Sequence, residues 1–115
     1  NKVLSGNDPT AHAEVEAIRE ACRKLNDFQL TGCEIYASCE PCPMCMGAIY
    51  WARPDKVYFA ANRVDAAGAG FDDAFIYEEL ELDYAHRKMS FIPCNGNEAR
   101  EVLEAWKIKE NKIRY

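Results

Sequence analysis

Apolar residues recur every three to four positions in the first quarter of the chain, within the stretch AHAEVEAIREACRKL at residues 11–25. This spacing places one set of side chains on a single helical face and most of the charged residues opposite it. Asp8-Pro9-Thr10 precedes the stretch and is typical of a helix start. The pattern predicts an amphipathic helix that ends near Asn26. The residues on its apolar face are Glu14, Val15, Ile18, Ala21, Cys22 and Leu25.

Two later segments alternate or are rich in β-formers, CEIYAS at 33–38 and KVYFAA at 56–61, and both read as strands. Between them, MCMGAIYWAR at 44–53 reads as a helix. Pro43 suits its first turn and Pro54 ends it. Strand, helix and strand in this order predict a right-handed parallel crossover.

The second half of the chain gives weaker signals. VDAAGAG at 64–70 is small and glycine-containing and predicts a loop, whereas 71–82 predicts a helix. A short strand is predicted at 88–93 and a final helix at 97–109, with an apolar face formed by Val102, Leu103 and Trp106. We therefore expect one α/β domain over 1–115, with 107–115 available as a C-terminal arm.

Composition and charge limit the possible functions of these 115 residues. Hydrophobic residues make up 49% and charged residues 29%, which is typical of a globular domain. The longest apolar run, at 48–52, is too short to span a bilayer, and the first residues lack the apolar segment of a signal peptide. The net charge of −5 does not favour nucleic acid binding. We expect a cytoplasmic protein without a membrane partner.

Glu14 is an unexpected residue on the apolar helix face, where a carboxylate is costly to bury unless it is paired. It could instead turn to solvent in the first helical turn, where acidic residues are common. His12 lies two residues earlier, and residues at this spacing do not face each other within a helix. Both could reach one site only if His12 lies at the helix cap.

The stretch CEPCPMC at 39–45 contains three cysteines and could be a redox pair, a disulfide or a metal site. Cys42 and Cys45 are three residues apart at a helix start, where the helix dipole stabilises thiolates. Together with His12 they make three ligands, which suits Zn²⁺ with an open fourth position. Cys39 could be a fourth ligand of a structural zinc, although we expect it to lie off the metal.

These motifs, HAE at 12–14 and PCPMC at 41–45, resemble the H-x-E and P-C-x-x-C signature of zinc nucleobase deaminases. The resemblance implies one catalytic zinc per chain, held by His12, Cys42 and Cys45. It also implies that the zinc generates a hydroxide nucleophile from water. Glu14 would be the catalytic proton shuttle, passing the water proton first to a ring nitrogen and then to the leaving amine.

Longer segments, at 7–22, 38–61 and 65–79, are similar to bacterial guanine deaminases within the cytidine-deaminase-like superfamily. This likeness implies a three-layer α-β-α fold with a mixed sheet, apparently lacking the family's N-terminal helix and hairpin. It also implies hydrolysis of guanine to xanthine and ammonia, with a purine base as substrate and a homodimer as the assembly. The metal motifs are shared with tRNA adenosine deaminases and cytosine deaminases, which remain alternatives.

The same resemblance assigns substrate contacts. Asn1 would hydrogen-bond the base, the backbone at Ala13 would meet the purine carbonyl, and Asp73 would contact the amino side and assist proton transfer. The aromatic residues assigned to the pocket are Trp51, Phe71 and, from the C-terminal arm, Tyr115. Trp51 and Phe71 could instead belong to the core, and Asp73 could be a helix cap.

Overall fold

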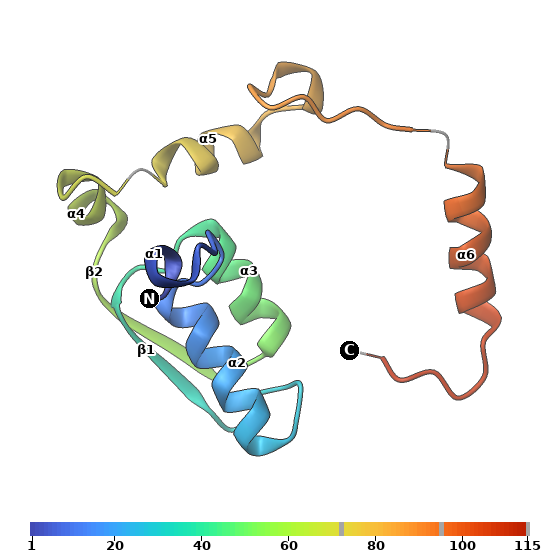
Figure 1. The fold of residues 1–115 in the computed structure, drawn as a ribbon, viewed down its shortest axis with the longest axis horizontal. Helices are drawn as coiled ribbons and strands as arrows, with labels where there is room; N and C mark the ends of the chain where they lie inside the picture. The colour runs from blue at the N-terminus through green and yellow to red at the C-terminus, as the bar shows by residue number, and fades with distance from the viewer. Residues whose placement is uncertain (72, 95, 115) are drawn as a thin grey trace. The chain divides into compact units, whose positions relative to one another are not determined.

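The computed structural model describes residues 1–71, 73–94 and 96–114, and it contains two compact units, Asn1–Glu78 and Glu79–Tyr115 (Figure 1). The first unit carries the sheet and most of the helices. Its elements are α1 (Val3–Gly6), α2 (Ala13–Leu25), β1 (Glu34–Cys39), α3 (Pro43–Ala52), β2 (Lys56–Ala61), α4 (Arg63–Gly68) and the start of α5 (Ala74–Glu81). The second unit contains the 3-10 turn η1 (Tyr84–His86) and α6 (Asn97–Ile108).

The predicted strand–helix–strand unit is confirmed. β1 and β2 pair in parallel, with Ile35 opposite Val57 and Tyr36 opposite Tyr58. The connecting helix α3 has Pro43 in its first turn and ends where Arg53 takes a left-handed conformation, with φ of 55°. A proline follows directly and prevents the helix from continuing.

The predicted amphipathic helix is also confirmed, as α2. It ends at Leu25, where Asn26 adopts φ of 52° and its N–H bonds the carbonyls of Cys22 and Arg23. α2 and α3 lie side by side next to the two strands (Figure 1). The buried apolar residues of the described chain are Ala11, Val15, Leu30, Pro41, Cys45, Ile49 and Ala52. The core is therefore small and extends directly to a cysteine of the candidate metal site.

The predicted loop at 64–70 is wrong, because residues Arg63–Gly68 form the short helix α4. Its start is a capping box. The Asn62 side chain accepts hydrogen bonds from the backbone of Val64 and Asp65, and the Asp65 carboxylate accepts one from the Asn62 N–H. The signal was present as Asn62-x-x-Asp65, but the small residues after it favoured a loop.

We expect Asn62→Ala to lower the free energy of unfolding by about 1 kcal/mol, because it removes the acceptor for two helix N–H groups. Asn62→Asp keeps an acceptor at this position and should restore most of that loss. Urea unfolding of both variants measures the difference. Equal destabilisation by alanine and aspartate would show that the cap does not hold α4.

The expected mixed sheet is not seen, since the described residues form two parallel strands only. The strand predicted at 88–93 is wrong as well. Lys88 donates its backbone N–H to the Glu79 side chain, and Phe91 stacks on Tyr84, so this segment is held by local side chains. Pro93 further lacks the N–H that a strand ladder needs.

Other sequence predictions for the second half are confirmed with shifted ends. The helix predicted at 71–82 is α5, which begins at Ala74, and the helix predicted at 97–109 is α6, which ends at Ile108. Among the described residues, no helix combines the length and the apolar character needed to cross a bilayer. The single domain over 1–115 and the C-terminal arm at 107–115 stay predictions.

Candidate metal centre and active site

His12 is placed by a tightly bonded turn ahead of α2. The Asp8 carboxylate accepts hydrogen bonds from the Thr10 amide at 2.8 Å and the Thr10 hydroxyl at 2.7 Å. These bonds hold the pKa of Asp8 below its usual range. The Ala11 carbonyl then accepts the N–H of Lys2 at 2.8 Å. His12 follows as the N-cap residue of α2 in an extended conformation, so its ring lies beyond the helix end, as expected.

The two cysteine ligands come from the start of α3. Cys42 is the N-cap residue, with φ of −63° and ψ of 167°, and Cys45 lies in the first turn. Neither Cys42 nor His12 uses its side chain to cap its helix. The starts of α2 and α3 therefore meet at one place, where both helix dipoles favour negative charge.

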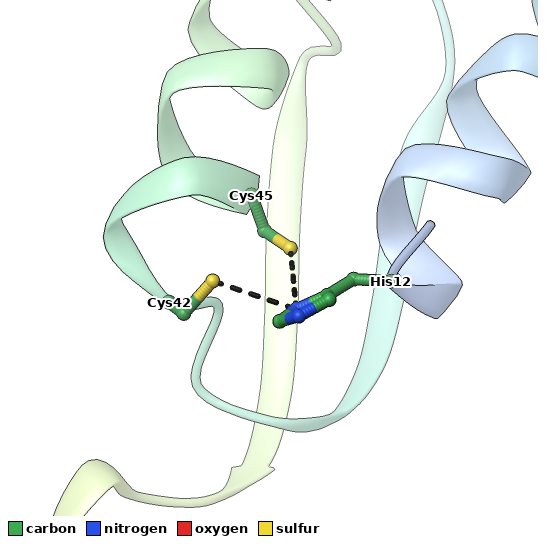
Figure 2. Close-up of side chains that lie close together, drawn as sticks. All are labelled: His12, Cys42 and Cys45. Carbon is green, nitrogen blue, oxygen red and sulfur yellow. Dashed lines mark hydrogen bonds between the residues drawn. The ribbon is translucent and has the colours of Figure 1, made fainter. Parts of the chain in front are cut away.

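The three side chains point toward one another (Figure 2). His12 Nδ1 lies 3.6 Å from Cys42 Sγ and 3.5 Å from Cys45 Sγ, and the ligand atoms are all within 4.8 Å of one another. Zinc bonds of about 2.3 Å to sulfur and about 2.0 Å to nitrogen, at a tetrahedral angle, would separate such atoms by about 3.5 Å. The donor set and its spacing therefore fit Zn²⁺.

The electrostatics of this cluster also favour a cation. Burial raises the pKa of the Cys45 thiol, and the neighbouring Cys42 sulfur and Glu14 carboxylate raise it further. Cys45 Sγ lies 3.5 Å from Glu14 Oε2. A divalent cation would offset the repulsion among these acidic groups and allow both sulfurs to bind as thiolates.

Glu14 is half-buried and directed at the cysteines, so the alternative in which it turns fully to solvent is wrong. Its carboxylate lies next to the Cys45 sulfur but is not one of the three side chains that could hold the metal ion together. Its position 3.5 Å from the Cys45 sulfur makes Glu14 a candidate for proton exchange at this site.

Cys39 lies outside the cluster, as expected. Its sulfur lies 3.8 Å from the carbonyl oxygen of Asn62. Cys39 is the last residue of β1 and precedes the turn that carries Cys42. Among the described residues, His12, Cys42 and Cys45 are the one group of three or more able to hold a metal. All six cysteines of the chain are described, and all are free thiols, which argues against the disulfide alternative.

Of the predicted substrate residues, Asn1 and Ala13 lie on the segments that lead into the metal cluster. Asn1 is exposed, and its side chain accepts the Val3 N–H at 3.0 Å. The ion pair between Lys2 and Glu16, 2.8 Å apart, ties this segment to α2. Ala13 is the first residue of α2, where a backbone N–H has no acceptor within the helix.

The remaining substrate residues are spread along the chain. Trp51 is 64% exposed near the end of α3, and Phe71 is 69% exposed ahead of α5, so neither is plain core. Asp73 directly precedes α5, and its Oδ1 atom is buried without a hydrogen-bond partner. Tyr115 lies outside the described residues.

Sequence reasoning missed Tyr77, whose hydroxyl group bonds the Pro41 carbonyl oxygen at 3.3 Å. It also missed Glu40 and Arg63, which join α4 to the same turn through a 2.9 Å bond between the Arg63 N–H and the Glu40 carboxylate. The spacing of Asp73 and Tyr77, four residues apart at a helix start, was the one available signal.

Comparison with known proteins identifies the family that the chain matches and the proteins to which it is similar. Residues 1–61 match the family described as the cytidine and deoxycytidylate deaminase zinc-binding region. The whole chain is 52% identical to a guanine deaminase of Bacillus subtilis and covers 74% of that protein. It is also 43% identical to a tRNA-specific adenosine deaminase of Aquifex aeolicus, over 98% of this chain and 74% of that one.

The X-ray structure of guanine deaminase from Bacillus subtilis superimposes on the whole chain with a TM-score of 0.95, and this chain covers 73% of that structure's chain. This agreement confirms the α/β cytidine-deaminase-like fold predicted from the sequence. The zinc ligand types, their spacing and the matched region agree with one another. The chain belongs to the cytidine and deoxycytidylate deaminase family and is a zinc-dependent hydrolase of that family.

Proposed function

We propose that this protein hydrolyses guanine to xanthine and ammonia. The observation that carries the proposal is the 52% identity to a guanine deaminase over the whole chain, combined with Glu14 lying beside the three metal ligands. Water adds to the carbon that bears the amino group. A carbon–oxygen bond forms, the carbon–nitrogen bond breaks, and the nitrogen leaves as ammonia.

His12, Cys42 and Cys45 would hold the zinc, which when bound supplies a Lewis acid that activates water at neutral pH. Glu14 is the proton carrier in this proposal. It lies in the first turn of α2, and its carboxylate is 3.5 Å from the sulfur of the ligand Cys45. It accepts a proton from the attacking water and delivers it to a ring nitrogen. It then transfers the second proton to the departing amino group.

We propose the substrate contacts that the family resemblance implies. Asn1 hydrogen-bonds the base, the Ala13 N–H faces the purine carbonyl, and Asp73 contacts the amino side. The buried, unpaired Oδ1 of Asp73 supports this role, because such an oxygen is costly unless a ligand donates to it. Phe71 and Trp51 are proposed as pocket walls, and Tyr115 as a residue that closes the pocket.

A substrate panel tests the proposal. The zinc-loaded protein is incubated with guanine, adenine, cytosine and guanosine, and xanthine and ammonia are quantified. We expect kcat/KM for guanine to exceed that for the other bases by about 10²-fold or more, because a site that hydrogen-bonds one base edge rejects bases lacking it. Turnover of adenine or cytosine without turnover of guanine would overturn the assignment.

A tRNA adenosine deaminase is the second candidate, supported by the 43% identity to the Aquifex aeolicus protein over nearly the whole chain. The net charge of −5 argues against it, because RNA binding relies on basic surface. Deamination of adenosine in tRNA, with binding that weakens steeply as salt rises, would favour this candidate.

We further propose a homodimer in the cytoplasm that acts in purine metabolism. Six free thiols, including Cys22, Cys33 and Cys94 outside the metal turn, are compatible with a reducing compartment. Sedimentation equilibrium measures the assembly. A mass of about 13 kDa at micromolar concentration would contradict the dimer.

A further inference from the structure

Tyr77 connects α5 to the turn that carries the cysteine ligands. Its hydroxyl group donates a hydrogen bond to the carbonyl oxygen of Pro41 at 3.3 Å, and Tyr77 is half-buried. Pro41 is buried and directly precedes Cys42. One side chain of α5 therefore fixes the residue next to a metal ligand.

Arg63 and Glu40 complete a closed set of contacts around this turn. The guanidinium carbon of Arg63 lies 5.1 Å from the centre of the Tyr77 ring, and the Arg63 N–H donates to Glu40 at 2.9 Å. Glu40 in turn donates its own N–H to the Ala61 carbonyl at 2.8 Å. Glu40 adjoins Pro41, so the contacts of Arg63 with Glu40 and of Tyr77 with Pro41 converge on one turn. Together with the Arg63–Tyr77 contact, they hold the Tyr77 ring in place.

The Tyr77 hydroxyl group is influenced by the charges of Asp73, a proposed substrate contact, and of Cys42, a metal ligand. Burial raises the pKa of Tyr77, and the negative charges of Glu40 and Asp73 raise it further, against the opposing effect of Arg63. Like any tyrosine hydroxyl group at neutral pH, this one is protonated and donates to the Pro41 carbonyl oxygen. Asp73 directly precedes α5, four residues before Tyr77, and its charge acts on the Tyr77 hydroxyl group.

We propose that Tyr77 is a positioning residue: its bond to Pro41 sets the place of Asp73 relative to the metal-binding turn and thereby tunes affinity for the purine. The inference rests on the proposed function, because Asp73 is taken there as a substrate contact. In this proposal Tyr77 acts through Asp73 rather than by contacting the substrate or the metal. Its effect belongs to binding of the base rather than to proton transfer.

Tyr77→Phe keeps the ring over Arg63 and removes only the hydroxyl group. We expect KM for guanine to rise about fivefold, the effect of losing one neutral hydrogen bond, while kcat changes by less than about twofold. Zinc content should be unchanged. Amide hydrogen exchange, measured without substrate, should become faster in the first turns of α5 and in the turn that contains Pro41.

Tyr58→Phe is the matched control, since it removes a hydroxyl group from the exposed sheet face where Tyr58 stacks on Tyr36. It should leave KM and exchange near Pro41 unchanged. Guanine turnover by the wild type would uphold the proposed function. In that case, an unchanged KM in Tyr77→Phe, or a fall in kcat alone, would overturn the role inferred for Tyr77. If the wild type fails to convert guanine, unchanged exchange at α5 still overturns the role of Tyr77, and faster exchange at both segments supports it.

Discussion

Replacing Cys42 by serine is expected to remove zinc from the protein and reduce kcat/KM for deamination by about 10³-fold or more, because the metal supplies several kcal/mol of transition-state stabilisation. The variant loses one of two thiolates, and serine is a poor ligand for zinc at neutral pH. The helix should survive, since Cys42 is the N-cap residue of α3 and serine is a preferred N-cap. Metal content by mass spectrometry and turnover are both measured.

Cys39→Ser is the matched control three residues earlier. Its sulfur faces the Asn62 carbonyl at 3.8 Å and is not part of the cluster, so this variant should retain one zinc per chain. Cobalt substitution separates the cases further, because the intensity of thiolate-to-metal absorption reports how many sulfurs bind. Absorption from three thiolates in the wild type, or loss of metal in Cys39→Ser alone, would contradict an open coordination position.

The metal cluster was predictable because local rules place each of its two motifs at a helix start, and the H-x-E and P-C-x-x-C signature joins the two motifs. Cys42 and Cys45 must share a face at the start of a helix, and His12 reaches them only from an N-cap position, which the Asp8-Pro9-Thr10 turn indicated. Glu14 was identified as an acid within an apolar pattern, and its half-buried place confirms that pattern. The meeting of His12 with cysteines 30 and 33 residues later is not a local signal, and it was implied by the family signature.

The contacts around α4 and α5 were harder to predict, because they join residues far apart in the chain and are not part of the H-x-E and P-C-x-x-C signature. The bond from Tyr77 to Pro41 spans 36 residues, and that from Arg63 to Glu40 spans 23. No periodicity encodes such a pairing. The strand predicted at 88–93 failed for a related reason, since the Glu79 side chain occupies the Lys88 N–H that a partner strand would need.

Glu14→Gln is expected to lower kcat by about 10²- to 10⁴-fold, the range for loss of a general acid–base group. The amide keeps the size of the side chain and its place 3.5 Å from the Cys45 sulfur, but it cannot accept and return a proton. Because Glu14 is not one of the clustered ligands, zinc content should stay at one per chain. Steady-state kinetics with guanine and metal analysis of the same sample measure both quantities.

Glu20→Gln provides the matched control on the same helix. Its carboxylate is exposed and pairs with Arg23 and Lys24, so the identical chemical change should alter kcat by less than about twofold.

A Glu14→Gln protein that loses zinc would show that Glu14 supports the metal rather than carrying protons. Full activity with zinc bound would assign proton transfer to another group, for which Asp73 is the proposed alternative. Retained zinc together with a lowered kcat and an unchanged affinity for guanine is the combination that only a proton carrier explains, because a change in folding or metal binding would alter the other two quantities as well.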